Sequence, residues 1–268
     1  MIAKSFINLA TALLAGASPI TDASSCSAGR PKPSLPSTGG DTELQAPSGN
    51  LTLKHIALGF GIQNYTCAGV DATPKATGAL AVLYDITDLY PGQTYRSLPS
   101  VAAFQQLGVT AMYGCDVPLN LDSSALTGSA GIIHQGADAA APFPADAPLE
   151  IDADAAAAAL PSSLSSAAFS GSIPFLGHHF FDASSVPNFV LSDLDYVGSK
   201  DQEVPAPKTA DKGVDGTGAV SWLRLGPKDG TYGAKELYRV TTVGGASHGC
   251  SEEGRDSTTY TAQYWFFE

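Results

Sequence analysis

The last eleven residues of the chain, TTYTAQYWFFE, constrain its fold more than any other segment. In this segment the even-numbered residues from Tyr260 to Phe266 alternate with the odd-numbered residues from Thr261 to Phe267. Alternation with a period of two is typical of a β-strand, and it places one of the two sets in a hydrophobic core. The other set is not very polar either, so we expect that this strand does not lie at the open edge of a sheet.

Similar short segments, rich in β-branched and aromatic residues, recur between Gly- and Pro-rich turns. They cover residues 51–67, 78–87, 172–182, 187–199, 218–227 and 233–245. With the C-terminal segment they make about seven or eight strands and few helices. The sequence therefore predicts an all-β fold, an antiparallel β-sandwich or barrel with long loops.

The stretch from about residue 136 to residue 172 differs because Ala and Ser dominate it. Asp152 or Asp154 can cap one short Ala-rich helix that ends before Pro161. The alternative, which we favour, is a flexible surface insertion between strands, because Ala and Ser bury little area to offset the entropy of ordering the chain.

The N-terminal segment MIAKSFINLATALLAGASPITDA has a Lys near its start, then an apolar run and small residues. This pattern is typical of a secretory signal peptide. We expect a signal peptide at 1–17, an extended Pro/Ser/Gly-rich lead-in at 18–50 and a single β domain at 51–268. No later stretch reaches the roughly 20 apolar residues of a membrane helix. The sequence therefore predicts an exported protein, secreted, extracellular or cell-wall associated, without a membrane span.

Export determines how the cysteines and the glycosylation motifs are interpreted. The four cysteines are Cys26, Cys67, Cys115 and Cys250, and none has the C-x-x-C spacing of zinc or redox sites. In an oxidising compartment we expect two disulfides, for which three pairings are possible. Asn50 and Asn64 begin glycosylation motifs. Asn64 lies in an expected strand, so Asn50 is the better acceptor.

The charge of the chain and one Gly-rich segment bear on nucleotide ligands. Charged residues make up 15% of the chain and the formal net charge is -12, so nucleic-acid phosphates would be repelled. The segment GFGIQN at 59–64 comes close to the dinucleotide fingerprint. It lacks the third glycine and the helix that must follow, so we predict neither a nucleic-acid partner nor a cofactor.

The segment GASHG at 245–249 fits the G-x-S-x-G motif of hydrolases. That motif requires a helix after the serine and a later histidine, yet no histidine follows His248. We interpret Ser247 as a loop residue, and the sequence predicts no catalytic residue.

The adjacent histidines of GHHFFD raise the question of a metal site. On a strand His178 and His179 point to opposite faces, whereas His178 and Asp182 share one face. His178, Asp182 and a further histidine, His248 or His55, could form a binding or metal site on a rigid sheet. The alternative, which we favour, is one core histidine bonded to a backbone carbonyl beside one surface histidine. No metal is therefore predicted.

Four aromatic residues could form a platform that stacks on sugar rings, as aromatic side chains do on other apolar ligand surfaces. They are Trp222, Tyr232, Tyr238 and Trp265. The alternative is that they belong to the core, as most aromatic residues in short strands do.

Several segments together resemble a known family. They are LKHIALGFGIQNYTC, GALAVLYDIT, GHHFFD, GAVSWLRL, ELYRVTTVGGASHGC and YTAQYWFF. They resemble domain-of-unknown-function family 3455, exported fungal and bacterial proteins whose fungal members are often labelled malate-dehydrogenase-like. The resemblance implies a secreted, mostly β domain with no established activity and supplies no catalytic residues. It also implies that Cys67 pairs with Cys250, which leaves Cys26 to join Cys115.

Taken together, the sequence predicts a secreted, disulfide-stabilised protein that binds cell-wall polysaccharide or another extracellular ligand. The alternative is a secreted metal-assisted or carbohydrate-active hydrolase that uses His178, Asp182 and His248. The malate dehydrogenase label finds no support in the motifs, because neither a phosphate-binding turn nor a parallel α/β pattern is present in the sequence.

We expect the purified protein not to reduce NAD in the presence of malate, because the sequence offers no nucleotide-binding turn. The absorbance of NADH reports the reaction directly. Turnover that scales with protein concentration would contradict this expectation.

Overall fold

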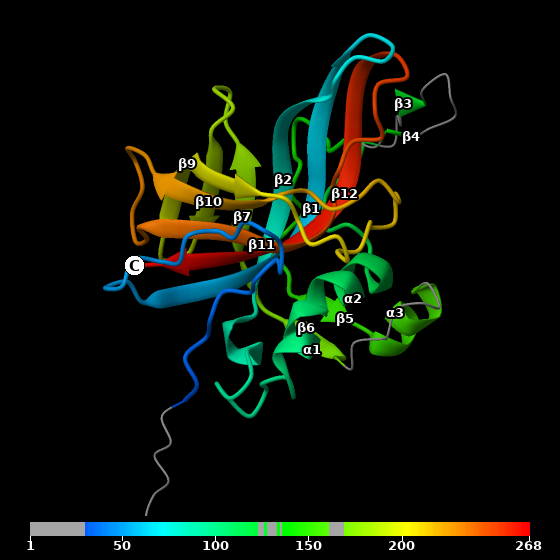
Figure 1. Cartoon of the computed structure of the whole chain (residues 1–268). Helices are drawn as coiled ribbons and strands as arrows, with labels where there is room; N and C mark the ends of the chain where they lie inside the picture. Colours follow the sequence, from blue (N-terminus) through cyan, green and yellow to red (C-terminus); the bar gives the residue numbers. More distant parts are fainter. Residues whose placement is uncertain (1–29, 123–125, 128–132, 135, 161–168) are drawn as a thin grey trace, which may run out of the picture. The chain divides into compact units, whose positions relative to one another are not determined.

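The structure, a computed structural model, describes residues 30–122, 126–127, 133–134, 136–160 and 169–268. Among these residues, eight antiparallel strands close into a barrel (Figure 1). In chain order they are β1 (Leu53–Ala68), β2 (Lys75–Asp85), β7 (Phe175–Phe181), β8 (Pro187–Leu191), β9 (Asp195–Val204), β10 (Trp222–Pro227), β11 (Glu236–Gly244) and β12 (Glu253–Phe267). The all-β prediction is confirmed, and a barrel rather than a sandwich is its form.

The barrel is an up-and-down meander that the first and last strands close. Each strand pairs with the next barrel strand along the chain, and β12 pairs on one side with β11 and on the other with β1. The β1–β12 ladder runs from Leu53 opposite Phe267 to Ala68 opposite Glu253. Closure leaves β12 without a free edge, as its apolar sequence indicates.

Both faces of β12 are buried from Tyr260 to Phe267, which explains why neither of its alternating sets is very polar. Tyr264 and Phe266 point into the barrel, where they join an inner core. Trp265 and Phe267 point outward into a second core between the barrel and its helices. The barrel therefore has a packed interior and one covered outer face.

The long connection between β2 and β7 covers that outer face. It contains the 3₁₀ turn η1 (Thr87–Leu89), helices α1 (Val101–Gln105), α2 (Leu107–Gly114) and α3 (Ala153–Ala159), and the short strands β3 (Leu126–Thr127), β4 (Ile133–His134), β5 (Leu149–Ile151) and β6 (Gly171–Ile173). Helix α2 contacts β12, and Figure 1 shows it beside the barrel. The side chains of Thr261 and Gln263 donate to the carbonyl oxygens of Gly108 (3.0 Å) and Phe104 (3.1 Å).

Of these three helices, the sequence offered α3 as one of two interpretations. The Asp152 side chain accepts hydrogen bonds from the backbone N–H groups of Asp154 (2.9 Å) and Ala155 (3.3 Å), so α3 begins as expected. Helices α1 and α2 were not predicted. Residues 107–112 of α2 are all buried, so this helix is apolar on every side and shows no amphipathic period.

The lead-in is described from residue 30, and residues 30–50 contain neither helix nor strand. It crosses the outside of the barrel, where the backbone N–H of Gln45 donates to Gln202 (2.8 Å) and the Ser48 hydroxyl donates to Glu236 (2.5 Å). The expected signal peptide lies outside the described residues. None of the described helices has the length and apolar character needed to cross a bilayer.

One disulfide ties the end of β1 to the turn before β12. It joins Cys67 to Cys250, as the family resemblance implied, and links positions 183 residues apart. Cys115 forms no disulfide with a described residue, and Cys26 lies outside the described residues. Pairing of Cys26 with Cys115 therefore stays a prediction.

We expect the double variant Cys67→Ala/Cys250→Ala to lose about 2–5 kcal/mol of unfolding free energy, because the disulfide restricts a very long loop in the unfolded chain. Chemical unfolding of the variant and the wild type measures the difference. The variant Cys115→Ala, measured alongside, gives the separate contribution of any Cys26–Cys115 bond. An unchanged unfolding midpoint for the double variant would contradict the prediction.

Candidate functional site

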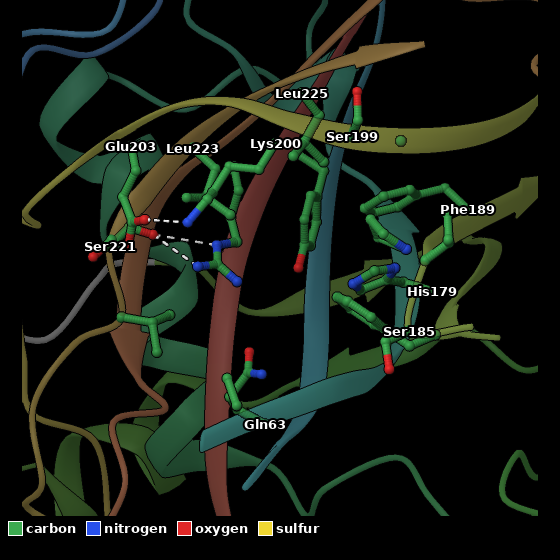
Figure 2. A pocket seen from close by; sticks show the side chains of 18 of the residues that line it. Gln63, His179, Ser185, Phe189, Ser199, Lys200, Glu203, Ser221, Leu223 and Leu225 are labelled. Atoms are coloured by element: carbon green, nitrogen blue, oxygen red, sulfur yellow. Dashed lines mark hydrogen bonds and ion pairs between the residues drawn. The ribbon is translucent and has the colours of Figure 1, made fainter. Parts of the chain in front are cut away.

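One end of the barrel opens into a cavity of about 780 Å³, here called the barrel pocket. Residues of all eight barrel strands line it, together with the turns at 184–186, 219–221 and 246–247 and Lys228. In Figure 2, His179 and Phe189 lie on one wall, while Glu203, Ser221 and Leu223 lie on the opposite wall. The pocket is therefore the outer part of the barrel interior.

Glycines of β1 leave room for the aromatic floor of this pocket. A Cβ atom on Gly59 would lie 2.5 Å from the Tyr264 ring, and one on Gly61 would overlap the backbone of β2. The GFG segment thus serves the packing of the barrel interior. It does not precede a helix, as phosphate binding would require.

His179 is the imidazole of the pocket. Its ring stacks on Phe189 with 3.9 Å between centroids and 4° between planes, and it also contacts Phe181 and Tyr264. Its Nδ1 lies 2.8 Å from the carbonyl oxygen of Asn188, and a carbonyl can only accept, so Nδ1 is the donor. Complete burial lowers the pKa of His179 to about 3. The ring is therefore neutral and held in one orientation.

Two further polar side chains of β1 are fixed by backbone carbonyls. The amide of Gln63 donates to Gly78 (2.6 Å), and the hydroxyl of Tyr65 donates to Gly245 (2.6 Å). Burial raises the pKa of Tyr65 to about 12, so its hydroxyl stays protonated at neutral pH. These contacts preform the pocket wall before any ligand binds.

The charged side chains of the pocket lie on β9, β11 and the turn after β10. Lys200 forms an ion pair with Glu203 at 2.6 Å, and this contact is drawn in Figure 2. Hydrogen bonding to Lys200 lowers the pKa of Glu203. Arg239 donates from Nε (3.3 Å) and Nη2 (2.9 Å) to the carbonyl oxygen of Ser221. Lys228 is the remaining charged residue of the pocket lining.

The GASHG turn borders the pocket through Ala246 and Ser247. The Ser247 hydroxyl donates to the carboxylate of Asp256, which is 1% exposed. His248 hydrogen-bonds to the same carboxylate through its backbone N–H (3.0 Å) and its Nδ1 (2.8 Å). The serine thus contacts a carboxylate rather than an imidazole base, so this arrangement organises the turn and is not that of an activated nucleophile.

The four candidate metal residues lie in separate places. His178 is on the outside of the barrel, 4.1 Å from the Phe143 ring centroid. Asp182 caps the β7–β8 turn by accepting from the N–H groups of residues 184 (2.8 Å) and 186 (3.0 Å). His248 lies beside Asp256, and His55 bonds to Asp193 (3.1 Å). Among the described residues no group of three His, Cys, Asp or Glu side chains could hold a metal ion.

The four candidate stacking residues differ in exposure and do not form one platform. Trp222, Tyr238 and Trp265 point outward from the barrel but are at most 3% exposed, because the lead-in and the helices cover them. Tyr232 is 69% exposed.

Of the two glycosylation motifs, Asn50 is exposed, whereas the side chain of Asn64 accepts from Ser257 (2.7 Å). Glycosylation stays a prediction for both.

The sequence analysis did not identify the polar residues that line the barrel pocket. Arg239 interrupts the apolar segment ELYRVTTV with a charge, on the same strand face as Leu237. An inward charge in an otherwise apolar strand is the signal that could have found it. His179 matches the favoured alternative of a core histidine bonded to a backbone carbonyl, but its place in a pocket was not foreseen.

Comparison with models of known protein families gives a match over most of the chain. A family model described as "Protein of unknown function (DUF3455)" matches residues 47–268. No curated protein and no solved structure matches the chain.

We expect His179 to destabilise the protein as the pH falls from about 6.5 to about 3. In this range the unfolded chain takes up a proton that the folded protein does not, because the folded pKa is depressed. The free energy of unfolding then falls by up to about 1.4 kcal/mol per pH unit from this group alone. Above this range His179 adds no pH dependence.

The variant His179→Phe keeps an aromatic ring against Phe189 and removes the titrating group. We measure the unfolding free energies of the variant and the wild type from pH 8 to pH 4, about the range of the titration. As the pH falls, the wild type should lose stability relative to the variant. Parallel curves would show that His179 is not held neutral.

Proposed function

The chain belongs to the DUF3455 family of proteins of unknown function, and we propose that it is an exported binding protein whose barrel pocket takes a small organic ligand. The observation that supports this most is the pocket itself, about 780 Å³ inside a closed eight-stranded barrel. Barrels of this size have room for one small ligand, and ligand pockets typically span about 300–1,000 Å³.

The lining of the pocket also fits a binding site. Apolar and aromatic side chains such as Leu223, Leu225 and Phe189 form most of its surface. A few polar groups, among them Gln63 and Tyr65, are fixed by backbone hydrogen bonds. An apolar surface with few, well-oriented polar groups is the usual composition of a small-molecule site.

Export is supported by the Cys67–Cys250 disulfide, because such bonds persist in oxidising compartments. The signal-peptide pattern at 1–17 supports it as well. Cell-wall association stays part of the proposal as a location. For cell-wall polysaccharide as the ligand, an exposed aromatic face is needed, and of the four candidate residues Tyr232 offers one. The barrel pocket is the better-supported binding site.

A binding role is favoured over the hydrolase alternative. Among the described lining residues, His179 is neutral and bonded to a backbone carbonyl, and Ser247 is bonded to Asp256. Glu203, the carboxylate of the lining, is paired with Lys200. The two opposed carboxyl groups of a glycosidase are therefore not assembled in the pocket.

We expect the neutral fluorophore N-phenyl-1-naphthylamine to bind the wild-type protein saturably at one site, because the pocket offers it an apolar environment. The variant Ala219→Trp places a large ring at the pocket lining and should weaken this binding about tenfold or more. The exposed variant Ala140→Trp is the matched control and should bind as the wild type does.

Fluorescence titration measures all three proteins, and circular dichroism verifies that each is folded. Unsaturable fluorescence in the wild type, or equal affinity in Ala219→Trp, would contradict the proposed site.

A further inference from the structure

We infer that the ligand of the barrel pocket is a small organic carboxylate, with its acid group on Arg239 and its apolar body against the rings around His179. This inference rests on the proposed function and specifies the chemical class of the ligand.

The first support is the charge of the pocket, which is opposite to that of the chain. The whole chain carries a formal net charge of -12. The pocket lining contains three cations, Lys200, Lys228 and Arg239, against one carboxylate, Glu203. Since Glu203 is already paired with Lys200 at 2.6 Å, the excess of positive charge in the lining lies with Arg239 and Lys228, of which Lys228 also interacts with the Asp182 carboxylate outside the lining. A cationic cavity in an acidic protein attracts anions selectively.

The second support is that Arg239 forms no ion pair within 4 Å with a described carboxylate; the nearby Glu203, whose pKa its charge lowers, is itself paired with Lys200. Its Nε and Nη2 donate to the Ser221 carbonyl oxygen, which is neutral and forms no ion pair with the guanidinium. A guanidinium has five N–H donors, so several remain for a ligand. Arg224 on the neighbouring strand β10 offers a contrast, because it points to the outside and pairs with Glu236 at 3.1 Å. A half-buried, unpaired arginine is suited to bind a carboxylate.

The third support is that the two ring side chains beside Arg239, Tyr264 and His179, add no negative charge. Tyr264 is its partner across the β11–β12 ladder, and burial raises the pKa of Tyr264, so its hydroxyl stays neutral. Burial likewise keeps His179 neutral. An acid group that enters the pocket therefore meets Arg239 with one carboxylate nearby, Glu203, which Lys200 already pairs.

The fourth support concerns the rest of the ligand. The stacked His179 and Phe189 rings, with Phe181 and Tyr264 at their edges, form a wall of flat surfaces. Leu223 lies on the opposite side of the pocket (Figure 2), and Leu225 lines it as well. This part of the barrel pocket suits a flat apolar or aromatic body better than a polyhydroxylated sugar. The hydroxyl groups of a sugar would lose their hydration there without enough hydrogen-bond partners in the pocket.

The test compares two probes of equal shape, naphthalene-2-carboxylate and naphthalene-2-carboxamide, by calorimetric titration. The wild type should bind the carboxylate about ten- to a hundredfold more tightly than the amide, which corresponds to one charge-assisted pair. Arg239→Gln should reduce this preference to near unity, and Arg239→Lys should keep part of it. Arg96→Gln is the matched control, because Arg96 also donates to a backbone carbonyl, that of Ser172 (2.7 Å), but lies outside the pocket.

The outcomes separate this inference from the proposed function. Binding of N-phenyl-1-naphthylamine together with equal affinity for carboxylate and amide would keep the proposed function and overturn the inference. Absence of binding by all three probes would overturn both. If Arg239→Gln does not fold, the carboxylate preference of the wild type and its loss at high salt still decide the matter, because only an ionic contact is screened.

Discussion

The pairing of β1 with β12 closes the barrel, and the interior depends on that closure. The two strands are 16 and 15 residues long and pair over almost their full length, with a bulge near Leu53. Because the ladder has no free edge, it both protects the apolar β12 and encloses a lumen. Gly59 accommodates the Tyr264 ring, and the Cys67–Cys250 disulfide holds the far end.

The inner end of this lumen is apolar, whereas the open end holds polar groups that the backbone fixes. Gln63, Tyr65, His179 and Arg239 all donate to backbone carbonyls. Such contacts avoid the cost of buried unsatisfied donors and hold the side chains in place. Three of the four side chains are neutral, so Arg239 is the group whose charge a ligand can still compensate. A rigid, cationic and aromatic pocket is the chemical basis of the proposed binding role.

The candidate site was only partly visible in the sequence, because its members come from many strands. Period-two reasoning separated His178 from His179 and correctly placed a histidine in the core. It could not show that His179 meets Arg239 and Gln63 at one barrel end, since strand register and closure decide which distant residues share a lumen. The grouping of His178 with Asp182 assumed that the strand extends through Asp182. Strand β7 ends at Phe181, however, and Asp182 lies in the following turn.

The sequence by itself determined the class of fold, because alternation and turn residues act over short distances along the chain. It offered the α3 helix as one of two interpretations and left its cap open between Asp152 and Asp154. It also carried the family resemblance that pointed to the Cys67–Cys250 bond. Only the tertiary structure decided between a sandwich and a barrel. It also placed α2 in a buried position between the barrel and α3, and it brought the residues of the pocket together. These features depend on contacts between residues far apart in the chain, and local patterns do not encode which partner each face will meet.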